Sequence, residues 1–519
     1  MKNSARQSMA WLHSWVGLLF GWILFAIFLT GSLSYYRHEI NIWSQPQLAN
    51  IQVHQKQAVL TGLNYLEKHA PKAKSWYLQV ANENNPINKI YWQTQDGTFN
   101  SKTLDPNTAQ ELNQLENQAG EFLYLFHFQL YGMPILTARL IVSCAAFMML
   151  ISLISGIITH KKIFTDFFTL RTFKGQRSYL DFHNVSSVIA LPFFLTITFT
   201  GLAILFYLFL PLSIQKTYPK NIFQFFDEIR TTQTVDFKST QSDKMLTADQ
   251  LLKHVKNNMG DVPLNIITVK EPNTSNAVAT FNALEDKTIT QNVAQTTLNA
   301  VTGEILSSNK NKSAIATLSA GVYGIHMMTF AQPLLRISLF ISGLLGCAMI
   351  GSGLLLWSLK RQLQQKTPQF NLGHYLVNRL NMTAILGLSI SLLCYLMSYR
   401  INSMFDIKLN EIHMFFTAWC ITFLLALFIF QTNLWKTFLK VFIALCTLFL
   451  IIDFYYFTYF FQATNTFNTW KIIRVDVFIL TFTLLGIFLH QKIEPIQNKA
   501  VSKIQMKLHK KNPTIGDLK

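Results

Sequence analysis

The sequence is poor in charged residues and lacks several short motifs that mark cofactor-binding and catalytic sites. Only 13% of its 519 residues are Asp, Glu, Lys or Arg. It contains no C-x-x-C-H, which excludes covalent attachment of a c-type haem. It also contains no H-E-x-x-H of the zinc proteases and no G-x-G-x-x-G for a dinucleotide. The sequence therefore offers no motif for a bound dinucleotide, a c-type haem or a zinc-protease site.

A disulfide framework is excluded as well. There are only five cysteines, and all of them fall inside apolar runs. They are Cys144, Cys347, Cys394, Cys420 and Cys446. We interpret them as small packing residues.

What the sequence has instead is long hydrophobic runs. Half of its residues are hydrophobic, and a helix needs about 20 apolar residues to cross a bilayer. The sequence therefore predicts a polytopic α-helical membrane protein with about eight transmembrane helices. We expect the first helix to be uncleaved, because no small-x-small site follows it. The predicted spans are 14–36, 135–158, 184–210, 335–357, 377–399, 411–431, 437–461 and 473–490.

Positive charge in the short connections predicts the orientation. Lys and Arg gather between the second and third spans, between the fourth and fifth, and after the eighth. They are Lys161, Lys162, Arg171, Lys174, Arg177, Lys360, Arg361, Lys366 and the lysines of the tail 491–519. These segments share one side with the N-terminus, so both termini are expected in the cytoplasm. The net charge of +18 follows from this asymmetry; we expect no nucleic-acid partner, and the tail can rest on anionic lipid.

The first four spans arise from an internal duplication. Residues 12–33 align with 182–203, so that His13 matches His183. Residues 124–140 align with 323–339, so that His127 matches His326. Helices one and two are thus repeated as helices three and four. The last four helices have no counterpart and form a separate C-terminal module.

The two long loops repeat too. Each has a helical pattern followed by short strands with turn residues, which predicts a small α+β domain in each loop. We therefore expect a first helix at 1–36, an α+β domain at 37–125 and helices two and three at 126–210. A second α+β domain at 211–325 precedes helix four at 326–360, the C-terminal module at 361–490 and the basic tail at 491–519.

Histidines lie at the ends of these spans. An ionisable side chain at membrane depth is costly and marks a functional site. His13, His160 and His183 lie on the predicted cytoplasmic side, whereas His127 and His326 lie on the opposite side. Two imidazoles from facing helices can bind both axial positions of a haem b without covalent linkage. Two such haems would carry electrons across the membrane, although imidazole also suits zinc.

Other polar residues accompany the histidines. Arg139 and Arg336 come shortly after Pro134 and Pro333, at the outer mouths of helices two and four, where they can pair with haem propionates or reach lipid headgroups. Asp166 and Asp181 can orient the cytoplasmic imidazoles or pair with nearby cations.

The block "SGIITHKKIFTDFFTLR" with "LDFHNVSSVIALPFFLTITFTGL" resembles the PepSY-associated transmembrane-helix family, in a match from residue 1 to about 360. The loop domains resemble PepSY domains. The resemblance implies a bacterial inner-membrane protein, with the siderophore reductases that hold two b haems as the closest functional type. It implies haem ligands among His13, His160, His183, His127 and His326. The duplication favours His13 with His183 as the inner pair, and the "THKKIF" block makes His160 a rival.

The implied activity is reduction of a ferric siderophore, or another ferric chelate, in the periplasm, with release of ferrous iron. The electron donor would be reduced flavin, quinol or a partner protein. Two alternatives stay open at this point: a membrane-anchored peptidase regulator built on the PepSY domains, and a transporter of siderophore or iron.

Overall fold

A computed structural model describes residues 4–112, 119–160, 171, 176–219, 225, 243–284, 288–290, 294–308, 314–364, 370–459 and 466–511. The chain divides into two units. The helical unit comprises residues 1–44, 119–202 and 333–519, and the sheet unit comprises residues 45–118 and 203–332.

The helical unit contains the hydrophobic runs. Its duplicated core consists of α1 (Ala5–Ser34), α4 (Ala119–Gln129), α5 (Ile135–Thr159), α6 (Gln176–Ile189), α7 (Leu191–Ile204) and α12 (Pro333–Gln364), with the short α2 (Arg37–Ser44) after α1. The C-terminal module consists of α13 (Leu372–Met382), the π-helical turn η4 (Thr383–Gly387), α14 (Leu388–Phe405), α15 (Glu411–Phe428), α16 (Leu434–Tyr459) and α17 (Thr466–Lys511).

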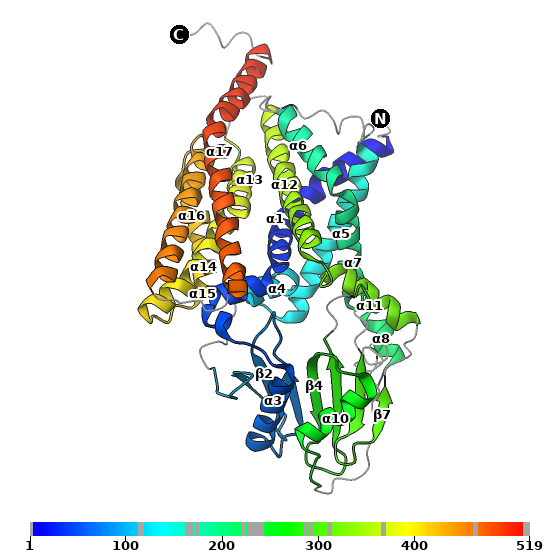
Figure 1. The fold of residues 1–519 in the computed structure, drawn as a ribbon. Helices are drawn as coiled ribbons and strands as arrows, with labels where there is room; N and C mark the ends of the chain where they lie inside the picture. Colours follow the sequence, from blue (N-terminus) through cyan, green and yellow to red (C-terminus); the bar gives the residue numbers. More distant parts are fainter. Residues whose placement is uncertain are drawn as a thin grey trace. The chain divides into compact units, whose positions relative to one another are not determined.

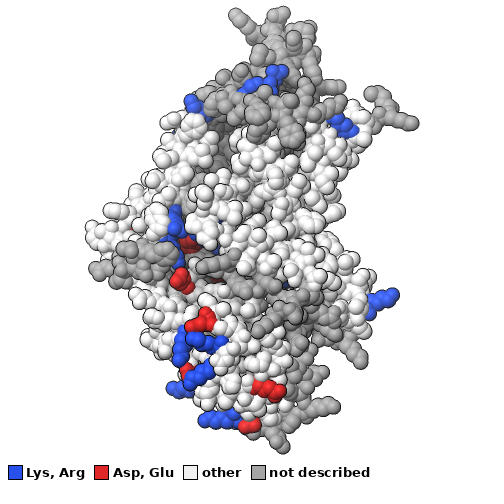
Figure 2. Space-filling view, turned by 45° about the vertical axis from the view of Figure 1, so that its right-hand side comes forward, with Lys and Arg blue, Asp and Glu red and all other residues white. Residues whose placement is uncertain are grey.

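Seven helices of the described chain are long and apolar enough to span a membrane. An eighth candidate is the pair Arg177–Ile189 and Leu191–Ile204, which is bent by 66°. Pro192 stands at the start of the second helix of this pair, and its ring cannot continue the preceding helix. The protein is therefore a polytopic helical membrane protein. On the face drawn in Figure 2, broad areas carry no Lys, Arg, Asp or Glu among the described residues, as expected where helices meet lipid.

The core helices pack around α1, which contacts α5 on one side and α12 on another. The helix α12 in turn packs against α6, while α16 and α17 run side by side in the C-terminal module (Figure 1). The sequence predicted a bend at Gly132 and Pro134. The chain does break there, since α4 ends at Gln129 and Gly132 has φ of +79°.

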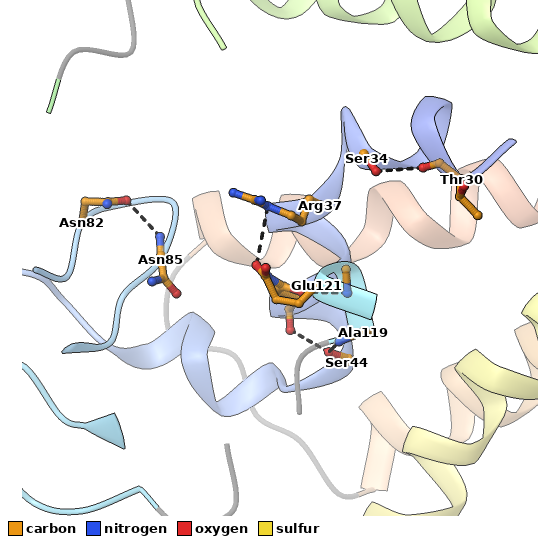
Figure 3. A network of polar contacts seen from close by, with 10 residues as sticks. Thr30, Ser34, Arg37, Ser44, Asn82, Asn85, Ala119 and Glu121 are labelled. Atoms are coloured by element: carbon orange, nitrogen blue, oxygen red, sulfur yellow. Dashed lines mark hydrogen bonds and ion pairs between the residues drawn. The ribbon is translucent and has the colours of Figure 1, made fainter. Parts of the chain in front are cut away.

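The short helix α2 connects α1 to the rest of the helical unit through polar contacts. Arg37 pairs with Glu121 of α4 at 3.5 Å, and the Ala119 amide donates to Ser44 Oγ at 3.4 Å (Figure 3). Asn41 Oδ1 accepts from the Gly120 amide at 2.7 Å. These contacts fix α4 against α2.

The other face of α2 joins the C-terminal module. Trp43 Nε1 donates to Asp453 of α16 at 2.7 Å, and the same carboxylate pairs with Arg400 of α14. All three side chains are buried. The Arg400 guanidinium also lies 3.9 Å from the centre of the Trp43 ring. This is a buried ion pair that also accepts a hydrogen bond from a third element.

The sheet unit is built from both long loops. The first loop provides η1 (Pro46–Asn50), α3 (Gln55–His69), β1 (Ser75–Gln79), β2 (Asn88–Gln93) and β3 (Phe99–Leu104). The second provides η3 (Phe206–Leu208), α8 (Pro211–Thr217), α10 (Ala248–Met259), β4 (Leu264–Lys270), β5 (Val278–Ala283), β6 (Gln295–Asn299), β7 (Ile305–Ser308) and α11 (Ala314–Met327). The helix-plus-strand pattern predicted for each loop is thus observed.

The structure differs from the expectation of two separate α+β domains. The strands form one seven-stranded sheet in the order β3-β2-β1-β4-β5-β6-β7. The joining pair is antiparallel, with Tyr77 of β1 opposite Thr268 of β4. This pairing removes two exposed strand edges, which are prone to unwanted association. One continuous core, with Trp76, Leu78 and Phe281 among its residues, extends under α3 and α10.

At one end of this sheet Glu111 binds two side chains, those of Lys102 and Tyr65. Its carboxylate accepts from Lys102 Nζ at 2.6 Å and from the Tyr65 hydroxyl. The hydrogen bond from Lys102 lowers the pKa of Glu111, and the bond from Tyr65 adds to this effect. Burial raises the pKa of Tyr65 to about 12, with a further contribution from Glu111.

We predict that Glu111 stabilises the sheet unit at neutral pH and loses this effect in acid. Because its folded pKa lies below the usual 4.5, the stabilisation is present above about pH 4.5 and is lost as pH falls through the folded pKa. Glu111→Gln should lower the melting temperature at pH 7 and flatten its dependence on pH between about pH 6 and pH 3. Thermal melts of the full chain in detergent check this. Equal pH dependence in both proteins would contradict it.

We also predict that the Arg400–Asp453 pair is essential for the stability of the helical unit. Asp453→Asn removes the carboxylate with which the buried Arg400 pairs, and breaking a buried ion pair costs about 3–5 kcal/mol. The matched control is Asp249→Asn, which breaks the exposed pair with Lys56 in the sheet unit. Melting midpoints in detergent should fall strongly for the first variant and hardly for the second. Similar midpoints in both variants would refute the assignment.

Candidate functional site

The structure brings His13 of α1 and His183 of α6 together inside the helical unit. Their ring centres are 6.1 Å apart, and the ring planes are inclined by 66°. They come from equivalent helices of the duplication, as the alignment of residues 12–33 with 182–203 predicted.

Each of these imidazoles is held by a backbone carbonyl of a neighbouring helix. His13 Nδ1 lies 2.9 Å from Ser152 O of α5, and His183 Nδ1 lies 2.8 Å from Met349 O of α12. A carbonyl only accepts, so each Nδ1 must carry the proton as the donor. The unprotonated nitrogen of each neutral ring is therefore Nε2, which is the nitrogen a metal can bind.

A glycine lies against each of the two rings. A Cβ at Gly156 would stand 3.2 Å from His13 Cε1, and a Cβ at Gly353 would stand 3.1 Å from His183 Cε1. Contacts this short displace the ring or the helix. Gly156 lies four positions after Ser152, and Gly353 lies four positions after Met349. Because glycine has no side chain, each imidazole can reach the carbonyl of the helix beside it.

The pair fits a six-coordinate iron. Metal–imidazole bonds of about 2 Å on two opposite sides place the ring centres roughly 6 to 6.5 Å apart, and the observed separation is 6.1 Å. The hydrogen bond on the other ring nitrogen is the usual second partner of a metal-bound histidine. Within the described residues no group of three or more His, Cys, Asp or Glu side chains is arranged for a metal ion.

His160 follows the last residue of α5 and has a different environment. Its Nε2 lies 2.9 Å from Asn184 Nδ2, so the nitrogen that His13 and His183 leave available is engaged here by an amide. His160 therefore has different hydrogen-bond partners from His13 and His183.

His127 of α4 repeats the arrangement at the other end of α1. Its Nδ1 lies 2.8 Å from Ile27 O, and a Cβ at Gly31 would stand 2.6 Å from the ring. His326 lies in α11 of the sheet unit. The pairing of His127 with His326 stays a prediction.

The predicted arginines and aspartates have protein partners. Arg139 Nη2 donates to Gln129 Oε1 at 3.1 Å. Arg336 pairs with the buried Glu39 of α2. Asp181 accepts from Arg171 Nε at 2.8 Å, which is one of the cation pairings that the sequence allowed. Asp166 lies outside the described residues.

The sequence analysis missed the residues that hold the imidazoles. Ser155 Oγ lies 3.5 Å from His13 Nδ1, and Ser352 Oγ lies 3.4 Å from His183 Nδ1. The signal that marks them is a Ser-Gly pair at the same place in α5 and α12. The buried Arg400–Asp453 pair was missed as well, since no spacing in the sequence relates these two residues.

The fold and the site define a class of membrane protein: a duplicated helical core in which imidazoles from repeated helices face each other or dock on neighbouring helices. The chain belongs to the PepSY-associated TM region family, whose model matches residues 10–360. The match covers the duplicated core and the sheet unit and ends before the C-terminal module. No curated protein matches the chain.

Proposed function

We propose that this protein is an inner-membrane b-type dihaem reductase that transfers electrons to ferric siderophores in the periplasm and releases ferrous iron. The observation that carries the proposal is the facing pair of His13 and His183, each with Nδ1 on a helix carbonyl and Nε2 available for iron. Family membership supports the inner-membrane location, and the distribution of Lys and Arg supports cytoplasmic termini.

In this proposal His13 and His183 would hold the haem near the cytoplasmic side. His127 and His326 would hold the haem near the periplasmic side, by the duplication that relates them. Bound haem b supplies one-electron exchange between ferric and ferrous iron. The chain's own contribution is to fix the ring tautomer, hold the ligands apart at the distance a six-coordinate iron needs, and keep the site within the apolar bundle.

The substrate is a ferric siderophore or a similar ferric chelate. One electron converts its iron to the ferrous state, which siderophores hold far more weakly. The transfer is outer-sphere, so it needs no general acid or nucleophile. The donor is reduced flavin, quinol or a partner protein, because the chain has no nucleotide-binding fingerprint.

Absorbance spectra of the purified protein test the proposal. The oxidised and dithionite-reduced protein should show the Soret and α bands of b-type haem, and a pyridine haemochrome assay should give about two haems per chain. His13→Ala and His183→Ala should each remove about one haem, since each takes away one axial ligand. His413→Ala, which changes an exposed histidine of α15, is the matched control and should keep both.

A folded wild-type protein from haem-replete cells that shows no visible absorbance would refute the proposal. Full haem content in both His13→Ala and His183→Ala would show that the protein binds haem. It would refute the assignment of His13 and His183 as ligands of the haem near the cytoplasmic side.

A further inference from the structure

Three ionisable side chains meet inside the helical unit. Arg400 of α14 and Asp453 of α16 form the buried ion pair described above. Asp476 of α17 is the third member, because its side chain is hydrogen-bonded to that of Asp453. Only 1% of Arg400 and of Asp453 is exposed, and Asp476 Oδ1 is buried as well. One guanidinium therefore faces two carboxyl groups, both of which lie in helices that are apolar enough to span a membrane.

This contact between two carboxyl groups requires a proton. An ionised carboxylate only accepts hydrogen bonds, so one of the two groups must be a carboxylic acid that donates to the other. The balance of charge leads to the same requirement. Two carboxylates beside one guanidinium would leave a net negative charge in an apolar environment, which is costly. One bound proton makes the group of three side chains neutral.

The hydrogen bonds indicate which of the two carboxyl groups carries the proton. Asp453 Oδ1 accepts from Arg400 Nε, and Asp453 Oδ2 accepts from Trp43 Nε1 at 2.7 Å. Each oxygen of Asp453 thus receives a donor, which favours the ionised form. Asp476 Oδ1 has no hydrogen-bond partner in the described part of the chain. The proton is therefore better placed on Asp476.

The guanidinium of Arg400 gives an independent indication. Its Nη1 and Nη2 atoms are buried and have no acceptor among the described residues, although Asp476 is close enough to interact with the Arg400 charge. An ionised Asp476 would be drawn to these two donors, since a charge-assisted hydrogen bond is about twice as strong as a neutral one. The Asp476 side chain contacts Asp453 instead, as expected of a carboxylic acid that donates to a carboxylate.

We propose that Asp453 and Asp476 share one proton, and that this carboxyl pair is a proton-binding site of the C-terminal module. The proton is carried by Asp476, which donates to Asp453, while Arg400 and Trp43 hold the accepting carboxylate in place. Release of the proton leaves an uncompensated charge beside Trp43 of α2. The attachment of the C-terminal module to α2 therefore depends on the bound proton.

Ionisable groups of the neighbouring helices have other partners. Glu39 of α2 pairs with Arg336 of α12 and lies 3.5 Å from Arg474 of α17. These three groups form a separate ion-pair cluster.

The ionisable groups closest to the carboxyl pair do not replace the proton. Asp453 and Arg400 are the charged groups that act on Asp476. Lys471 of α17 is buried, but five positions along a helix place it about 140° around the axis from Asp476. The hydroxyl of Tyr456 in α16 is uncharged at neutral pH.

Infrared spectroscopy of the full chain in detergent tests the proposal without any substitution. A protonated carboxylic acid has a C=O stretching band that a carboxylate lacks. At neutral pH the wild-type protein should show this band, and the band should shift when the protein is made with aspartate labelled with carbon-13 in its side-chain carboxyl group. If no band responds to the label, Asp476 is ionised and the proposal is wrong.

Two variants assign the band to its residue. Asp476→Asn should abolish it and still fold, because the amide N–H₂ can donate to Asp453 as the carboxylic acid does. The matched control is Asp406→Asn, which changes the exposed aspartate directly after α14 and should keep the band. A label-sensitive band that persists in Asp476→Asn would place the proton elsewhere and overturn the site.

The pH dependence of unfolding is the second measurement. A proton that the folded chain holds and the unfolded chain releases contributes stability that is lost as pH rises above the unfolded carboxyl pKa of about 4. The unfolding equilibrium constant of the wild type should therefore rise about tenfold per pH unit relative to that of Asp476→Asn, as long as the site keeps its proton. Denaturant unfolding at about pH 5, 6 and 7 measures this ratio. A ratio that does not change with pH would contradict the proposal.

Neither measurement depends on haem. A label-sensitive band in a protein without haem keeps the proton site and refutes the reductase. A dihaem protein without the band refutes the proton site and keeps the reductase.

Discussion

The hydrogen bond from a histidine Nδ1–H to a helix carbonyl is the interaction on which the site depends. An imidazole inside a bilayer must satisfy its N–H, and every carbonyl of a regular helix is already an acceptor within its own helix. The lone pair that remains can accept from a side chain that approaches the helix from outside, provided that no Cβ blocks the way. Gly31, Gly156 and Gly353 remove that obstacle at three carbonyls. The tautomer and the ring position both follow from this one contact.

A second constraint is the burial of charge in the helical unit. Glu39 of α2 is buried and accepts from Arg336 of α12, with Arg474 of α17 at 3.5 Å from the same oxygen. Asp453 is buried between Arg400 and Trp43. Charged groups at membrane depth persist only when they are paired. The two carboxylates therefore join α2 to α12 and to the C-terminal module, and α2 in turn fixes α4, the helix that carries His127. The module outside the family match is thus connected to the core by the Arg474–Glu39 ion pair and the Trp43–Asp453 hydrogen bond, and not only by apolar packing.

Much of the architecture could be predicted from the sequence, because the lengths of the hydrophobic runs and the internal duplication can both be read from it. The spans, the break before Pro134 and the facing of His13 and His183 follow from run lengths, proline chemistry and the alignment of the repeats. The joining of two loop domains into one sheet could not be predicted, since strand pairing between β1 and β4 depends on register across nearly 200 residues. The carbonyl partners of the histidines could not be predicted either, because every residue has a backbone oxygen and no residue type marks the one that binds. The glycines beside them are visible in the sequence, yet their meaning appears only with the rings against them. Arg336 was predicted to pair with a haem propionate or to reach lipid headgroups. It pairs with the carboxylate of Glu39, which no sequence motif marks.

Electron paramagnetic resonance of the oxidised protein tests the central claim most directly, because it reports the axial ligands of ferric haem. Imidazole on both faces of the iron gives a low-spin signal, and the account predicts this signal in the wild-type protein. It predicts that His183→Ala, which removes about one haem per chain, also removes the low-spin signal of that haem. A wild-type spectrum that is high-spin, or one that His183→Ala leaves unchanged, would contradict the assignment of the facing imidazoles as ligands.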